Sequence, residues 1–299
     1  MIGPRSVAAA ALVCAAAVAL TLRPSEITLD GHALSWTYDG HGALSAGASS
    51  RLLYDYPAKE RSDILDLLFK PNFGASLHHI KVEIGGDGQS TDGTEASHMH
   101  SRDDISCDRG YEFWLLTEAR KRNPHIKTYA LSWASPWWVG NQTGFYSQDE
   151  IDYHISWLNC TKQHDIGTID YMGNWNERAW GTSDWTKEFK QAMVNAGHAE
   201  TQLIIPDGFE AKSVEAAADK DEQFKSAVAG IGMHYPCNQP DPAVQQTYDW
   251  KYWSSEDYST VGNWSGAGCW GRILNQNFVR MNSTCLRSHL LLPVLQLSL

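Results

Sequence analysis

The chain has 299 residues, of which 42% are hydrophobic and 20% are charged, and its formal net charge is −11. This composition is typical of a folded protein with a sizeable core, and it excludes an intrinsically disordered chain. The acidic balance argues against a nucleic-acid-binding surface, which requires a basic face, so we expect no nucleic-acid partner.

A secretory signal peptide is expected at residues 1–22. Arg5 provides the positive charge, and an uncharged run rich in Ala, Val and Leu follows from Ser6 to Leu22. A signal anchor is the alternative because the run is long, but the small residues around Ala15–Ala17 would allow cleavage. No other span is long and apolar enough to cross a membrane, so we expect no stable membrane span. Residues 23–37 then form an N-terminal lead-in.

Glycosylation motifs and cysteines also indicate the secretory pathway. Four Asn-x-Ser/Thr tripeptides begin at Asn141, Asn159, Asn263 and Asn282. Six cysteines are present, and five remain if Cys14 leaves with the signal; this odd number implies a free thiol or a missing partner. The sequence contains no Cys-x-x-Cys pair, so a zinc site or a thioredoxin-like site has no support.

Short β-rich runs then alternate with segments of helical periodicity. The predicted strands are Tyr38–Leu44, Leu77–Ile84, Lys127–Trp133, Ile169–Trp175, Thr201–Pro206, Ala229–Tyr235 and Lys251–Ser255. The predicted helices are Arg61–Lys70, Gly110–Arg122, Gln148–His164, Asp184–Ala196 and Lys212–Ala227, with another starting at Gly271–Phe278. This alternation predicts an α/β fold with a parallel sheet, and seven such strands favour an eight-stranded (β/α)8 TIM barrel over residues 38–278. An open doubly wound sheet is the alternative, but Gly40–Gly47 lacks its Gly-rich phosphate loop.

The eighth strand of this barrel has no clear counterpart in the sequence. After Phe278 the chain shows no punctuation between a strand and a helix, and it ends in a Leu-rich run from Leu290 to Leu299. We therefore interpret residues 279–299 as a divergent tail and expect the barrel to be truncated before its last strand.

Two glutamates follow predicted strands and form a candidate catalytic pair. Glu177 lies in Trp-Asn-Glu-Arg after the fourth strand, and Glu256 lies in Ser-Ser-Glu-Asp after the seventh. The catalytic groups of β/α barrels lie at the carboxyl ends of strands, and retaining glycosidases need one acid/base carboxyl and one nucleophilic carboxylate. Helix capping is the alternative for either motif taken alone.

Metal and serine-hydrolase sites find less support. His98 and His100 lie near Asp87 and Asp92, but this loop lacks the EF-hand pattern and the chain has no His-Glu-x-x-His. No Gly-x-Ser-x-Gly is present to start a Ser-His-Asp triad. We therefore expect no metal and no cofactor.

Long sequence blocks resemble glycoside hydrolase family 59, the galactocerebrosidase family. The matching blocks are Asp39–Ser45 with Ser50–Leu53, Phe69–His78, Lys81–His100, Trp175–Arg178, Trp253–Asp257 and Gly266–Asn277. The twenty-residue block from Lys81 is the most specific. The resemblance implies an N-terminal portion of the family's chain, because the β-sandwich and lectin-like domains of full members have no counterpart here.

The resemblance also implies roles for particular residues. Glu177 is similar to the family's proton donor and Glu256 to its nucleophile, while Thr91, Trp133 and Asn176 match its galactose-binding positions. The implied substrate is a galactosphingolipid such as galactosylceramide, and the implied location is the lysosome, with a lipid-presenting activator protein as a further partner. We also expect the site to keep Glu177 protonated near an acidic working pH. A barrel glycosidase acting on a galactan or glucan, and an inactive truncated product, are the alternatives.

Overall fold

The computed structural model describes residues 28, 30–32, 37–91, 93–141, 143–236, 248–258 and 264–288. The chain divides into two units, Met1–Trp36 and Thr37–Leu299, and the second holds all the described helices and strands. The predicted signal peptide lies outside the described residues, as does most of the lead-in.

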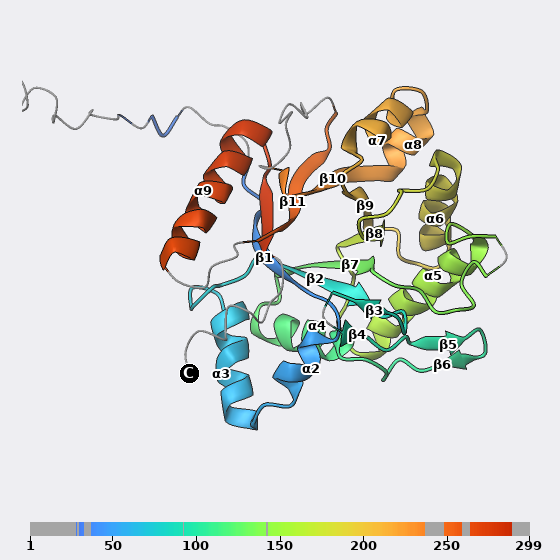
Figure 1. Cartoon of the computed structure of the whole chain (residues 1–299), viewed down its shortest axis with the longest axis horizontal. Coiled ribbons are helices and arrows are strands. Elements are labelled where there is room, and N and C mark those ends of the chain that lie inside the picture. Colours follow the sequence, from blue (N-terminus) through green and yellow to red (C-terminus); the bar gives the residue numbers. More distant parts are fainter. Residues whose placement is uncertain are drawn as a thin grey trace, which may run out of the picture. The chain divides into compact units, whose positions relative to one another are not determined.

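Eight parallel strands close into a barrel, in the order β1-β12-β11-β10-β9-β8-β7-β2 (Figure 1). The strands are β1 (Gly40–Ser45), β2 (His79–Ile84), β7 (Lys127–Ser132), β8 (Tyr171–Trp175), β9 (Gln202–Gly208), β10 (Val228–His234), β11 (Lys251–Asp257) and β12 (Cys285–Ser288). Two small hairpins, β3 (Gln89–Ser90) with β4 (Gly93–Thr94) and β5 (Met99–Ser101) with β6 (Asp104–Ile105), lie between β2 and the next helix. All seven predicted strands overlap barrel strands, so the predicted fold class is confirmed.

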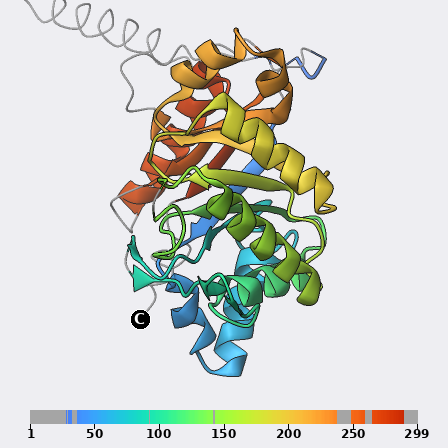
Figure 2. The same cartoon turned by 90° about the vertical axis from the view of Figure 1, so that its right-hand side faces the viewer.

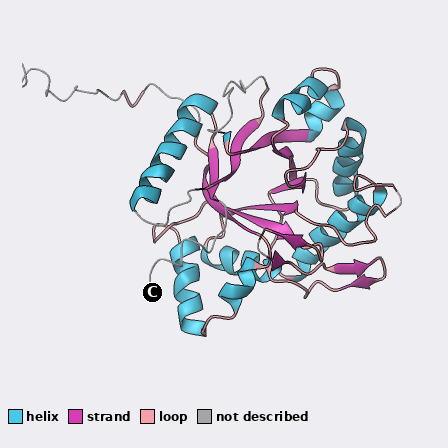
Figure 3. Cartoon of the chain, viewed as in Figure 1, coloured by secondary structure: helices cyan, strands magenta, loops and turns pink. Residues whose placement is uncertain are grey.

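Helices surround the strands, as Figure 3 shows with strands in magenta and helices in cyan. They are α2 (Ser49–Tyr54), α3 (Ala58–Phe69), α4 (Glu112–Arg122), α5 (Gln148–Gln163), α6 (Ser183–Asn195), α7 (Ala211–Ala218), α8 (Glu222–Ala227) and α9 (Trp264–Met281). The turned view in Figure 2 shows α5 and α6 lying next to each other. None of the helices in the described residues is both long and apolar enough to span a membrane.

The predicted helix over residues 212–227 is two helices in the structure. Asp221 interrupts it, because its side chain accepts a hydrogen bond from the Phe224 backbone N–H at 2.9 Å and caps α8. An Asp in this position satisfies a backbone donor that the start of a helix otherwise leaves unpaired.

The expectation of a missing eighth strand was wrong. β12 pairs in parallel with β1, through Gly40–Cys285 and Ala43–Ser288, and also with β11. The strand is only four residues long and carries a buried Arg287, whose guanidinium lies over the rings of Tyr129 and Trp253. A short strand that contains an arginine lacks the apolar pattern by which strands are recognised. The barrel therefore extends past residue 278, and residues 289–299 lie outside the described part of the chain.

The alternation of side chains along the strands sorts them between two environments. In β2, Ile80, Val82 and Ile84 pack in the large apolar cluster shared with the helices, while Lys81 and Glu83 face the other side of the sheet. Successive strand residues point to opposite faces, so a hydrophobic layer outside the sheet implies an inner layer built from the remaining positions. All six residues of β2 are buried, which places the Lys81 ammonium inside the barrel.

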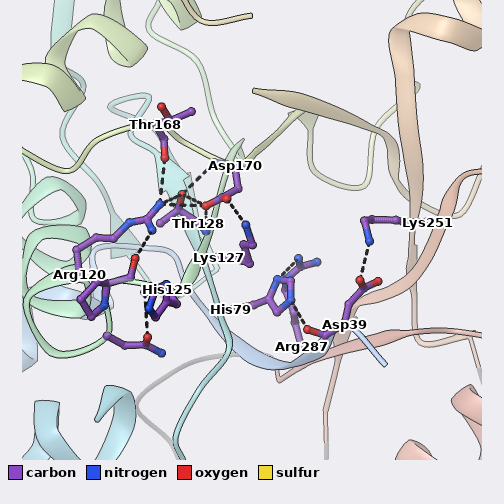
Figure 4. Close-up of polar contacts among 12 residues, drawn as sticks. Asp39, His79, Arg120, His125, Lys127, Thr128, Thr168, Asp170, Lys251 and Arg287 are labelled. Carbon is purple, nitrogen blue, oxygen red and sulfur yellow. Dashed lines mark hydrogen bonds and ion pairs between the residues drawn. The ribbon is translucent and has the colours of Figure 1, made fainter. Parts of the chain in front are cut away.

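Polar contacts tie the strands together at their amino ends (Figure 4). Asp39, which precedes β1, accepts hydrogen bonds from Lys251 Nζ at 2.6 Å and Trp253 Nε1 at 2.8 Å. His79 bonds the Asp39 carbonyl at 3.1 Å and Arg287 at 3.1 Å. These residues come from β2, β11, β12 and the position directly before β1, so the network links the first and last strands at the end of the barrel opposite the carboxyl ends.

Candidate active site

Glu177 and Glu256 meet at the carboxyl end of the barrel. One carboxylate oxygen from each, together with a ring nitrogen of His234, lie within 4.8 Å of one another. Glu177 comes two residues after β8 and Glu256 is the penultimate residue of β11. The closure of the barrel brings these strand ends together although 256 − 177 = 79 positions separate the residues along the chain.

The backbone holds Glu177 in a conformation that L-residues rarely adopt. Its φ is 52°, and its N–H donates to the Asp207 carbonyl at 3.0 Å. The neighbouring Asn176 N–H donates to the Ser132 carbonyl at 2.8 Å. Gly208 permits the close approach, since a Cβ there would lie 3.3 Å from the Glu177 Cα. Surrounding contacts are needed to keep such a residue in the left-handed region, which costs about 1–3 kcal/mol.

The Glu256 side chain is almost fully buried and contacts polar groups. Its Oε1 accepts a hydrogen bond from the Tyr235 hydroxyl at 2.8 Å. Its Oε2 lies 3.8 Å from both Lys81 Nζ and His234 Nδ1. The phenol donor and the two nitrogen groups restrict the orientation of this carboxylate, as a nucleophile in a displacement reaction requires.

Asp207 connects these cationic groups beneath the two glutamates. It accepts hydrogen bonds from Lys81 Nζ at 2.8 Å, His234 Nε2 at 2.5 Å and Ser255 Oγ at 3.2 Å, and from the Tyr129 hydroxyl. Burial alone would raise the pKa of Asp207, but the charge of Lys81 and the hydrogen bond from His234 outweigh it and hold the pKa below its usual value. The carboxylate is therefore a permanent anion inside the barrel.

His234 joins Asp207 to Glu177. Its Nε2 bonds Asp207, and its Nδ1 bonds Glu177 Oε1 at 3.0 Å. Burial lowers the pKa of His234, but the hydrogen bonds to Asp207 and Glu177 and the charge of Glu256 more than reverse this and raise it to about 9. A pKa of about 9 makes the ring an imidazolium at neutral pH, so that both of its nitrogens donate, one to Asp207 and one to Glu177.

The hydrogen bond from His234 lowers the pKa of Glu177, and the partial burial of Glu177 does not offset this. This direction is opposite to the one expected from the sequence, in which the site would keep Glu177 protonated. The cause is a charged neighbour from β10 that lies 57 positions away along the chain. The ionised form is the one that accepts a proton, and the protonated fraction of Glu177 grows as the pH falls.

The three predicted sugar-binding residues occupy different places around this pair. Trp133 follows β7, and its ring lies 4.9 Å from Lys81 Nζ. Asn176 precedes Glu177, and its buried Oδ1 has no hydrogen-bond partner within the described residues, so it can accept a bond from a ligand hydroxyl. Thr91 is exposed at the turn between β3 and β4, in the connection that leaves the carboxyl end of β2. Their roles in binding sugar remain predictions.

Sequence reasoning missed Lys81, Asp207, His234 and Tyr235. Three of them lie at the carboxyl ends of predicted strands five and six, and the fourth is a lysine inside an apolar strand. The rule that catalytic groups of barrels lie at strand ends would have selected Asp207, His234 and Tyr235. Lys81 could have been found in another way, because it lies in the middle of a predicted strand. A lysine is almost never fully buried without a partner, so its position indicates an acidic partner inside the barrel.

The histidines considered as metal ligands have other contacts in the structure. His98 stacks on Tyr153 with 4.7 Å between ring centroids, and His100 Nδ1 lies 2.6 Å from Asp87 Oδ2. Asp92 lies outside the described residues.

Residues 38–292 match the family model described as glycosyl hydrolase family 59. A galactocerebrosidase from Danio rerio is 50% identical over 253 residues, which cover 83% of this chain and 38% of the relative. The Homo sapiens galactocerebrosidase is 45% identical over 263 residues, covering 85% of this chain and 38% of the relative. The chain thus spans about two fifths of the length of the curated relatives it matches.

Solved structures share the fold at low sequence identity. An endo-β1,6-glucanase, BT3312, has a TM-score of 0.69 at 17% identity and covers 87% of this chain and 68% of its own. The catalytic domain of a xylanase from Talaromyces cellulolyticus has a TM-score of 0.66 at 17% identity, with 85% and 68% covered. At such identities the likeness supports the barrel fold alone.

Proposed function

Because the chain belongs to glycosyl hydrolase family 59, we propose that it removes β-linked galactose from galactosylceramide and related sphingolipids with retention of configuration. The single observation that carries the proposal is the distance between the two carboxyl groups, whose nearest oxygens lie within 4.8 Å. Retaining glycosidases hold their carboxyls about 5–5.5 Å apart, whereas inverting enzymes need about 6.5–9.5 Å to admit a water molecule.

In the first step Glu256 attacks the anomeric carbon and forms a galactosyl ester. The glycosidic C–O bond breaks, and Glu177 gives its proton to the leaving oxygen of the ceramide. In the second step Glu177 takes a proton from water, the water oxygen attacks the anomeric carbon, and Glu256 leaves as a carboxylate. Tyr235 keeps Glu256 oriented through the 2.8 Å hydrogen bond.

Asn176 and Trp133 fit the sugar side of this reaction. The free Oδ1 of Asn176 can accept a bond from a galactose hydroxyl, and such bonds to the 2-hydroxyl strengthen in the transition state. The Trp133 ring offers an apolar face, and Thr91 a hydroxyl. Glu177 must carry a proton to act as an acid. Because its pKa is lowered, the pH must fall toward that pKa before a sizeable fraction of Glu177 is protonated, so the reaction favours acidic conditions.

We also propose a lysosomal glycoprotein that reaches its lipid with the help of an activator protein. The Cys107–Cys160 disulfide supports a secretory route, since disulfides persist in oxidising compartments. Asn141 and Asn159 are both exposed, as glycosylation would require. A glycosidase treatment that shifts the mass of the secreted protein tests the glycosylation, and an unchanged mass would contradict it.

The catalytic assignment is tested with 2-deoxy-2-fluoro-β-galactosyl fluoride, which forms a slow galactosyl ester in retaining enzymes. Peptide mapping should find the label on Glu256, and Glu256→Gln should abolish turnover of an aryl β-galactoside while the melting temperature is kept. A label on another residue, or near-normal turnover by the variant, would contradict the proposal. A panel of galactan and glucan oligosaccharides separates the alternative barrel glycosidases.

The alternative of an inactive truncated product receives no support from the barrel itself, because β12 pairs with both β1 and β11 and leaves neither of these two strands with a bare edge.

A further inference from the structure

Three aromatic side chains form a connected surface at the carboxyl ends of β9, β10 and β11. Phe209 follows β9, Tyr235 follows β10 and Tyr258 follows β11. The ring centroids of Phe209 and Tyr235 are 6.4 Å apart, and those of Tyr235 and Tyr258 are 5.3 Å apart. Phe209 is 56% exposed and Tyr258 is 47% exposed. Single exposed rings are ordinary, but a contiguous group of them indicates a binding surface.

This aromatic surface adjoins both catalytic glutamates. Phe209 directly follows Gly208, whose backbone lies against the Glu177 Cα. The Phe209 ring centroid lies 5.9 Å from that of His234, which bonds Glu177. At the other side, the Tyr235 hydroxyl bonds Glu256. An occupant of the surface would therefore lie next to the reacting bond.

The order of the strands shows which part of the substrate lies there. β8, which carries Glu177, has β7 and Trp133 on one side and β9 and Phe209 on the other. The general acid must lie within hydrogen-bond reach of the glycosidic oxygen, between the sugar and the leaving group. If galactose occupies the side of Trp133 and Asn176, the leaving group extends over the side of Phe209.

We propose that Phe209, with Tyr235 and Tyr258 beside it, forms the subsite that binds the hydrocarbon part of the aglycone nearest the glycosidic oxygen. This inference rests on the proposed function and adds to it the place of the lipid. Aromatic rings bind alkyl chains by removing apolar area from water and have no directional demand, so the subsite accepts chains of different length. Phe209 is the determining residue, since Tyr235 is engaged with Glu256.

Octyl β-galactoside and methyl β-galactoside test the subsite, because their leaving groups have similar reactivity and differ in chain length. The unaltered protein should show the higher kcat/KM for the octyl compound. Phe209→Ala should lower the octyl-to-methyl ratio of kcat/KM about tenfold, the value of a small apolar contact in a binding site. Phe209→Leu keeps part of the apolar contact and should lower the ratio less.

Phe73→Ala is the matched control, since Phe73 is 48% exposed and follows α3, on the side of the barrel where β2 begins. It should leave the ratio as in the unaltered protein. β-Galactosyl fluoride, which has no aglycone, separates the two possible failures. If the unaltered protein does not hydrolyse the fluoride, the proposed function is wrong. If it does hydrolyse the fluoride, the octyl-to-methyl ratio of kcat/KM decides on the subsite. A ratio for Phe209→Ala equal to that of the unaltered protein would show that Phe209 does not bind the hydrocarbon part of the aglycone.

Discussion

At the scale of single residues, the site depends on one buried histidine that contacts two acids. His234 bonds Asp207 through Nε2 and Glu177 through Nδ1, and its raised pKa of about 9 keeps it cationic throughout the acidic and neutral range. A fixed cation beside an acid/base carboxyl lowers the pKa of that carboxyl. In the proposed mechanism, the pH at which Glu177 donates its proton is thus set by His234, which takes no direct part in bond breaking.

We expect His234→Asn to move the basic limb of the kcat/KM profile to higher pH. The variant removes the positive charge, so the pKa of Glu177 rises and the protonated acid survives to higher pH. Activity at the optimum should also fall by about 10²-fold, since a carboxyl that shifts by roughly 1 Å loses that much. The measurement is a pH profile with phenyl β-galactoside, whose poor leaving group needs the acid. A profile that only loses height would assign His234 a purely structural role.

At the scale of elements, two long-range connections hold the barrel together. β12 closes the sheet between β1 and β11. The Cys107–Cys160 disulfide joins the segment before α4 to α5 across a separation of 53 residues. Both connections link parts that are remote in sequence. The disulfide removes conformations from the unfolded chain. β12 pairs with backbone groups of β1 and β11 that the folded barrel would otherwise leave unpaired.

A chain that ends at Asn282 should not give a soluble, cooperatively melting protein. It lacks β12, which leaves unpaired N–H and C=O groups along β1 and β11 and exposes the edges to other chains. A chain that ends at Leu292 retains β12 and is the control. Size-exclusion chromatography and thermal melting measure the difference, and equal behaviour of the two chains would show that β12 does not close the barrel in solution.

Replacing both Cys107 and Cys160 by Ser should lower the free energy of unfolding by about 4 kcal/mol, the loop entropy that a crosslink of this span removes from the unfolded chain. Denaturant melts under oxidising conditions measure it. Cys269→Ser is the control, since Cys269 is a free and partly exposed thiol. A double variant as stable as the control would mean that the disulfide does not form.

At the scale of the whole molecule, buried acids make the stability depend on pH. Burial raises the pKa values of Glu83 and Glu95 to about 7, and those of Glu112 and Glu150 well above the ordinary value. A free glutamate titrates at about 4.3, so the native state binds the extra protons above that pH. The stability they provide is complete below the unfolded pKa and is lost as the pH rises through the folded pKa.

Buried histidines act in the opposite direction. Burial lowers the pKa values of His79 and His98 to about 3 and that of His154 to about 4. Unfolded histidine titrates at about 6.5, so the unfolded state binds these protons first. Their contribution is complete above that value and is lost as the pH falls. The two groups nearly cancel between about 4.3 and 6.5, which predicts a plateau in this acidic window.

We therefore expect the melting temperature at pH 5–6 to exceed that at pH 8 by several degrees. Glu112→Gln should reduce this difference, because a neutral amide replaces a carboxyl that is difficult to ionise and can still accept bonds from Ser45 and Ser50. Glu60→Gln, an exposed change in α3, is the control. A melting temperature that rises from pH 5 to pH 8 would contradict the assignment of the buried acids.

The sequence by itself determined the barrel and the positions of the two glutamates at strand ends. Local periodicity is enough for this, because alternating strands and helices admit few architectures and residues after a strand lie at a known end of it. The seven apolar strands carried that signal strongly. The four-residue β12 with its buried Arg287 did not, since its burial comes from partners on distant strands.

Only the tertiary structure decided the electrostatics of the site. Lys81, Asp207, His234 and Glu177 come from four strands or their ends, and no spacing along the chain indicates that they lie within hydrogen-bond distance of one another. Protonation depends on charge and burial at a few ångströms, while sequence patterns report neighbours along the chain. The glutamate pair could therefore be found from sequence, but the direction in which the pKa of Glu177 shifts could not.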